Sequence, residues 1–180
     1  TIKVNSGASL TMQSESRLGD GFATDATTLD NHGTLTFAGG GNYFFHDDTH
    51  ITNSGVVNLP SGGTVRWYSP LTGNPEPSVV NAAAGVIDTD ATTRFELPFE
   101  NDGDVQVATT VVLAWPTAAG DDDGTYTTAD AAAIVRADGD RTLTNPTPIV
   151  GLGLLETGPF DRTLTFDANT VERLAIRSGA

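Results

Sequence analysis

A short pattern recurs along the first hundred residues of this chain. It consists of an apolar residue, then Asn and Gly at alternate positions, then two more apolar residues at alternate positions. Strict copies are Leu29, Asn31, Gly33, Leu35, Phe37; Ile51, Asn53, Gly55, Val57, Leu59; and Phe99, Asn101, Gly103, Val105, Val107. Looser copies are Val4, Asn5, Gly7, Leu10, Met12 and Val79, Asn81, Gly85, Ile87. Repetition on this scale is typical of stacked architectures, in which each repeat buries its core against its neighbours.

The spacing of the copies predicts the fold class. Successive asparagines of the pattern are separated by 26, 22, 28 and 20 residues, as their positions show: Asn5, Asn31, Asn53, Asn81 and Asn101. Within each copy the apolar residues alternate, which predicts short strands with one face inward. We therefore expect an all-β, parallel β-solenoid with irregular coils of about 20–28 residues. A β-sandwich has the same composition and stays open as the alternative.

The recurring Asn and Gly residues have a structural interpretation. In stacked coils, asparagines at one turn can hydrogen-bond to those above and below at about 4.8 Å. We expect such a ladder from the five asparagines named above. Gly33, Gly55 and Gly103 follow two residues later, where we expect glycine to supply a positive φ. Asn-x-Gly is also a common turn signature in its own right.

These copies resemble the degenerate coils of right-handed parallel β-helices in large secreted bacterial surface proteins, of the adhesin and autotransporter-passenger type. The resemblance covers residues 1 to 107. It implies a single-stranded right-handed solenoid that serves as an elongated extracellular or cell-surface scaffold, in some relatives with carbohydrate-active sites.

Composition limits the partners. Twenty-three acidic residues against nine basic ones give a net charge of −14, which disfavours nucleic acid and anionic lipid as ligands. The chain has no cysteine, so disulfides and thiolate metal sites are excluded. No apolar stretch approaches the roughly 18 residues that span a bilayer, so we expect no membrane insertion. The sequence starts at Thr1 without a leader-like segment, as expected of a processed product or of part of a larger extracellular chain.

The second half is less regular than the first. Residues 116–142 are expected to form a lateral loop or short-helix insertion, with Thr128 capping a helix that extends to Ala137. Apolar alternation returns beyond this segment, so we expect the coil to resume. The prediction is a single solenoid domain over residues 1–180.

Two acidic segments are candidate metal sites. His46 and His50 flank two aspartates and a threonine, and imidazole with carboxylate suits zinc or a similar divalent ion. Asp121, Asp122 and Asp123 form a run of oxygen ligands that suits calcium, although it lacks the alternating acids of an EF-hand loop. Both segments are also typical of solvated loops. No other cofactor is expected.

Carbohydrate chemistry is a further candidate. Trp67 and Tyr68 are adjacent in an expected strand, so one ring points outward, where it can contact a glycan. Two carboxylate pairs fit glycosidic cleavage, although turns also favour aspartate: Asp88 with Asp90, and Asp102 with Asp104. No nucleophile motif accompanies the serine and histidine residues. The sequence therefore predicts no enzyme.

The ends of the stack suggest self-association. Ile2 and Val4 lie in the first expected strand, and Leu174 and Ile176 lie in the last. Open strand edges pair readily with another chain, either head to tail or by strand exchange. We expect a non-enzymatic, extracellular structural or adhesive protein that forms a homopolymeric fibre. The alternative is a carbohydrate-binding or polysaccharide-cleaving β-helix module.

Overall fold

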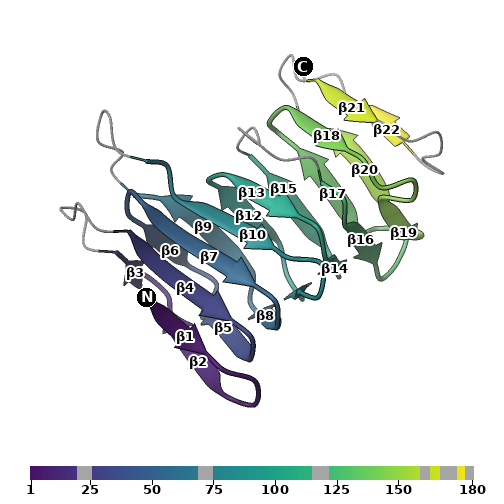
Figure 1. Ribbon diagram of the computed structural model, residues 1–180. Helices are drawn as coiled ribbons and strands as arrows, with labels where there is room; N and C mark the ends of the chain where they lie inside the picture. The colour runs from purple at the N-terminus through teal and green to yellow at the C-terminus, as the bar shows by residue number, and fades with distance from the viewer. Residues whose placement is uncertain (20–25, 69–74, 115–121, 159–162, 167–173, 177–180) are drawn as a thin grey trace.

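The computed structural model describes residues 1–19, 26–68, 75–114, 122–158, 163–166 and 174–176. Within these ranges the chain forms strands and turns and no helix. Figure 1 shows the strands side by side in one stack that runs from the N-terminus to the C-terminus. Every strand pairing in the described ranges is parallel, which confirms the all-β parallel solenoid and excludes the antiparallel β-sandwich.

Each regular coil contributes one strand to each of three sheets. The first three coils contain β1 (Ile2–Val4), β2 (Ser9–Gln13) and β3 (Arg17–Leu18); β4 (Thr27–Asn31), β5 (Thr34–Ala38) and β6 (Asn42–Phe45); and β7 (Thr49–Asn53), β8 (Val56–Leu59) and β9 (Gly63–Trp67). The next two contain β10 (Ser78–Asn81), β11 (Val86–Thr89) and β12 (Thr93–Glu96); and β13 (Phe99–Asn101), β14 (Asp104–Val107) and β15 (Thr110–Leu113). The remaining strands are β16 (Thr125–Thr128), β17 (Ile134–Ala137), β18 (Arg141–Leu143), β19 (Ile149–Gly151), β20 (Leu154–Thr157), β21 (Leu164–Phe166) and β22 (Leu174–Ile176).

We name the three faces after their strands. Sheet A contains β1, β4, β7, β10 and β13; sheet B runs from β2 to β19; and sheet C runs from β3 to β22. Beyond β13, Asp122 bridges to Leu143, and β18 pairs with β21, which continues the face of sheet A. The core lies between the faces and is filled by the inward members of each alternating strand, the largest being Tyr43, Tyr126, Phe45 and Phe99.

Buried asparagine side chains connect four successive coils. The Nδ2 of Asn31 donates to Oδ1 of Asn53 at 2.7 Å, Asn53 donates to Asn81 at 2.8 Å, and Asn81 donates to Asn101 at 2.8 Å. All four residues are inaccessible to solvent. The Asn53 amide also donates to a main-chain carbonyl in the next coil and accepts from the N–H of Gly55. We call these four residues the asparagine ladder.

Asn5 does not belong to the ladder, contrary to the sequence-based expectation. The register pairs Val4 with Asn31, so Val4 occupies the inward position and Asn5 lies one residue further on, where it is exposed. The one-residue shift is set by the pairing of this coil with the next, which the spacing within a single copy does not determine.

The glycines of the pattern are required by crowding rather than by a positive φ. The glycines with positive φ lie at other turns, and Gly33, Gly55 and Gly103 are not among them. A Cβ on Gly55 would overlap the main-chain oxygen of Gly33, and a Cβ on Gly103 would overlap that of Gly85. The main chains of successive coils therefore approach too closely at this corner for any side chain.

The helical insertion predicted around residues 116–142 is wrong where the structure describes it. Thr128 ends β16, and Ile134 begins β17, so the segment is part of a regular coil. The turn between them is held by Asp130, whose carboxylate accepts the N–H groups of Ala132 at 2.7 Å and Ala133 at 3.2 Å. Pairing with the strands of the preceding coil outweighs the helix propensity of the alanines. Residues 116–121 lie outside the described ranges.

Replacement of Asn53 by Ala tests the asparagine ladder. The change removes one of the two acceptors of the buried Asn31 Nδ2 and the donor to the buried Asn81 Oδ1, so we expect the free energy of unfolding to fall by about 3 kcal/mol. Asn58→Ala, on the outer face of β8, is the matched control and should cost less than about 0.5 kcal/mol. Urea denaturation measures both, and equal losses would contradict the ladder's role.

Candidate functional site

An aromatic cluster lies on the outer side of sheet C. The Arg17 guanidinium carbon lies 4.4 Å from the centroid of the Tyr68 ring, within cation–π range. Phe44 and His46 contact the same ring edge-on, with centroid distances of 5.2 Å and 5.0 Å. The cluster is therefore a surface on which aromatic rings and one cation hold each other in place.

Trp67 and Tyr68 point to opposite sides of sheet C, as their adjacency predicts. Trp67 is in register with the fully buried Phe45, and its Nε1–H donates to Asp47 at 2.5 Å. Tyr68 faces outward into the aromatic cluster. Of the two candidate glycan contacts, Tyr68 has the outward ring, and glycan binding there stays a prediction.

Further along sheet C, charged residues form a linked series of ion pairs. Glu96 pairs with Arg66 at 3.1 Å and with Arg94 at 2.7 Å. Asp138 pairs with Arg94 at 2.9 Å and with Arg136 at 2.8 Å. All five side chains are partly exposed, so each pair contributes little stability alone, and their main effect is to neutralise this face of an acidic chain.

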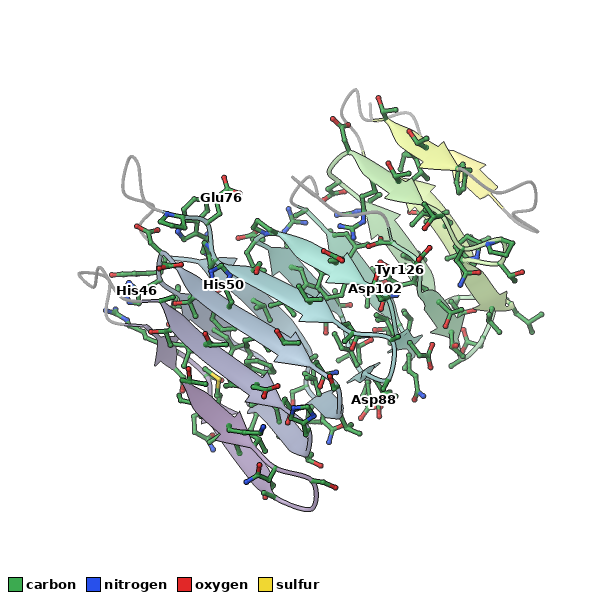
Figure 2. The ribbon with its side chains drawn as sticks, viewed as in Figure 1. His46, His50, Glu76, Asp88, Asp102 and Tyr126 are labelled. Carbon is green, nitrogen blue, oxygen red and sulfur yellow. The ribbon has the colours of Figure 1, made fainter. Side chains whose placement is uncertain are left out.

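The two histidines of the candidate metal segment have different neighbours. His46 contacts Tyr68 in the aromatic cluster, whereas His50 lies on sheet A. Figure 2 shows both in the N-terminal half of the stack. In the described part of the chain, no group of three His, Asp or Glu side chains is arranged to hold a metal ion. The structure does not assemble the metal site expected from His46 and His50.

His50 instead takes part in a hydrogen-bonded series that sequence reasoning missed. Its Nδ1 lies 2.8 Å from the Ser78 hydroxyl oxygen, and its Nε2 lies 3.1 Å from an Asp48 carboxylate oxygen. Ser78 is 28 positions away in the chain but directly opposite His50 in the register. The only sequence signal for this contact is the separation of one coil length.

A buried ion pair occupies the core just beyond the asparagine ladder. Arg141 donates to both carboxylate oxygens of Asp122, and each side chain is 1% exposed. The Tyr126 hydroxyl donates to Asp122 at 2.9 Å, and the main-chain N–H of Asn101 donates to it at 3.0 Å. Arg141 also donates to the main-chain oxygen of Phe99 at 2.8 Å. Burial, and then the Asp122 charge, raise the pKa of Tyr126 well above its usual value.

This geometry contradicts the calcium site expected from three consecutive aspartates. Asp122 points into the core, where Arg141 neutralises it, whereas Asp123 is exposed and accepts a hydrogen bond from Thr144. Consecutive residues in an extended segment face opposite ways, so these carboxylates do not converge. Asp121 lies outside the described residues.

The two carboxylate pairs considered for glycosidic cleavage differ, because Asp102 and Asp104 have separate partners whereas Asp88 and Asp90 interact. Asp104 accepts the hydroxyls of Thr125 at 3.0 Å and Thr127 at 2.7 Å on sheet B. Asp102 instead interacts with Glu100, and the pKa of each is raised by partial burial and by neighbouring carboxylates. Burial, and then the Asp90 charge, raise the pKa of Asp88. Figure 2 shows Asp88, Asp102 and Tyr126 in the middle of the stack.

Asp122→Asn tests the buried ion pair. The change leaves the Arg141 charge buried without its counterion, so we expect the free energy of unfolding to fall by about 3–5 kcal/mol. The exposed neighbour provides the control, since Asp123→Asn should cost less than about 0.5 kcal/mol. Asp122→Asn combined with Arg141→Met should recover part of the loss. No recovery in the double variant would show that the charge imbalance is not the cause.

The raised carboxyl pKa values predict the pH dependence of stability. Asp88, Glu100 and Asp102 bind protons more tightly in the folded chain than in the unfolded chain. Their contribution is present at low pH and is lost as the pH rises through the folded pKa values. The melting temperature should therefore increase as the pH falls from 7 towards the ordinary carboxyl pKa values of about 4. Glu100→Gln with Asp102→Asn should reduce that increase, and an unchanged pH profile would contradict the assignment.

The described residues include no helix long and apolar enough to cross a membrane. Comparisons with protein-family models, with curated proteins and with solved structures found no match to this chain.

Proposed function

We propose that this chain is a non-enzymatic structural or adhesive element of an extracellular surface, and that its coils assemble end to end with those of further copies. The residues that recur along the sequence serve coil stacking, because the asparagines form the buried ladder and the glycines permit close main-chain approach. The extracellular setting is supported by the resemblance to solenoid coils of secreted bacterial surface proteins.

The observation that carries the proposal is the outward direction of main-chain groups in the first described coil, to which a further parallel coil can pair. Among the described strands, β1 pairs with β4 alone, β2 with β5 alone and β3 with β6 alone. Val4 O accepts from His32 N–H at 2.8 Å, and Ala8 O accepts from Thr34 N–H at 3.0 Å. Alternate residues of a parallel strand bond to the same neighbour, so the main-chain groups of Lys3 and Thr11 point away from the stack.

A parallel stack with such an edge favours a second copy as its partner. The opposite end of sheet C is β22, which contains Leu174 and Ile176 and pairs with β20. Addition of an edge strand satisfies the free N–H and C=O groups on both sides. Contacts of this kind do not close on themselves, so they generate filaments. Ile2, which is 41% exposed at the first coil, would be covered by the added coil.

A second candidate is carbohydrate binding at the aromatic cluster. Tyr68 and Phe44 are partly exposed aromatic residues on sheet C, and Arg17 supplies hydrogen-bond donors beside them. A glycan screen distinguishes this candidate, because Tyr68→Ala should abolish sugar binding and leave filament formation intact.

Lys3→Pro with Thr11→Pro tests end-to-end assembly. Proline removes one outward N–H from each edge strand and is tolerated at sheet edges. We expect the wild type to form filaments in negative-stain electron microscopy as its concentration rises, and the double variant to remain as short particles. Lys3→Ala with Thr11→Ala keeps both N–H groups and should still polymerise. A wild type that stays monomeric at every concentration would refute the proposal.

A further inference from the structure

Ser78, His50 and Asp48 form a connected series on the outer face of sheet A. His50 lies in β7 and Ser78 lies opposite it in β10, one coil further on. The two ring nitrogens of His50 are both engaged, Nδ1 with Ser78 at 2.8 Å and Nε2 with Asp48 at 3.1 Å. The His50 side chain is 37% exposed and that of Asp48 is 23% exposed, so the series is accessible from solvent.

The chemistry of the three groups fixes the direction of the hydrogen bonds. An ionised Asp48 can only accept, so the proton of the neutral His50 ring lies on Nε2. Nδ1 then carries a lone pair and accepts the Ser78 hydroxyl proton. In this arrangement the serine hydroxyl is hydrogen-bonded to a base, and a carboxylate orients that base. The same combination activates serine nucleophiles. In the usual serine–histidine–aspartate series Nε2 faces the serine and Nδ1 faces the aspartate. In this chain the two ring nitrogens are exchanged.

The main chain holds Asp48 in an uncommon conformation. Its φ of 54° lies in the left-handed region, where residues other than glycine are infrequent. Its N–H donates to Pro75 O at 2.8 Å, and its C=O accepts from Thr27 N–H at 2.9 Å. Contacts from two other coils therefore hold the Asp48 main chain in this conformation.

We propose that Ser78 is a nucleophile that accepts an acyl group from an activated ester. Ser78 Oγ forms a bond to the acyl carbon, and its proton passes to Nδ1 of His50. The bond between the acyl carbon and the leaving oxygen then breaks, and the leaving group takes up that proton. The products are Ser78 bearing the acyl group as an ester and the free alcohol or phenol, with no oxidant or reductant required.

The surroundings restrict the reaction to activated esters, whose good leaving groups compensate for the lack of oxyanion donors, and they make hydrolysis of the product ester slow. Val79 N–H donates to Pro98 O at 2.9 Å, and the alternation of the strand directs the N–H of Ser78 toward β7. Both groups are thus engaged in sheet A, and neither can stabilise an oxyanion. Figure 2 shows Glu76 on the same side of the stack as His50. The negative charges of Asp48 and Glu76 favour uncharged or cationic acyl donors. This inference is independent of end-to-end assembly.

The test is acetylation by p-nitrophenyl acetate, followed by peptide mass spectrometry. In the wild type we expect Ser78 to be acetylated faster than any other serine. Ser78→Ala should remove that product, and His50→Gln should slow it by about 100-fold. Ser9→Ala, on the outer face of sheet B, is the matched control and should leave the Ser78 rate unchanged. Ser78 labelling no faster than Ser9 labelling, or an unchanged rate in His50→Gln, would overturn the proposal.

Asp48 is a positioning residue and has its own readout. In Asp48→Asn the amide can donate to Nε2, which transfers the ring proton to Nδ1 and removes the base. We expect acetylation to slow by at least about tenfold and the ¹⁵N NMR signals of His50 to show the opposite tautomer. Circular dichroism checks that each variant keeps its β structure. If Asp48→Asn is folded and keeps both the wild-type His50 tautomer and the wild-type acetylation rate, the positioning role of Asp48 is excluded.

Discussion

The structure depends on the hydrogen bonding of buried amides from one coil to the next. Each interior ladder amide needs partners in the coils on both sides, and burial makes any unmet bond costly. Those partners are present only when adjacent coils align residue for residue. The ladder thereby fixes the register of the four coils that it connects, including outer pairs that make no contribution to the core, such as His50 with Ser78.

The ladder ends differently on its two sides. In the first described coil the inward position in register with Asn31 is occupied by the apolar side chain of Val4. Beyond Asn101 the core contains Asp122 and Arg141, and the Asn101 N–H bonds to this pair. A buried ion pair is weak support for stability, since desolvation offsets the attraction. The pair is hydrogen-bonded to Asn101 and Phe99 in the preceding coil. These bonds maintain the register between coils beyond the last asparagine of the ladder.

Local patterns in the sequence were sufficient to predict the parallel coils and all four asparagines of the ladder, because alternation and Asn-x-Gly spacing are properties of short segments. They were insufficient for Asn5, since a shift of one residue depends on the register with the next coil. The alanines before Ile134 favour a helix locally, and only the neighbouring strands override that preference. The contact of His50 with Ser78 depends on loop length as well, because coil lengths vary between 20 and 28 residues.

Inner and outer positions consequently have separate roles in this fold. Inner residues must satisfy the core of adjacent coils, whereas outer residues are aligned by the same register but are free to carry different chemistry on each face. Sheet C carries the ion pairs and sheet A carries the serine, histidine and aspartate series. Lengthening a loop between coils preserves this alignment. A shift of β7 by one residue would turn His50 into the core and expose Ile51, so outer chemistry can persist only while the buried amides hold the register.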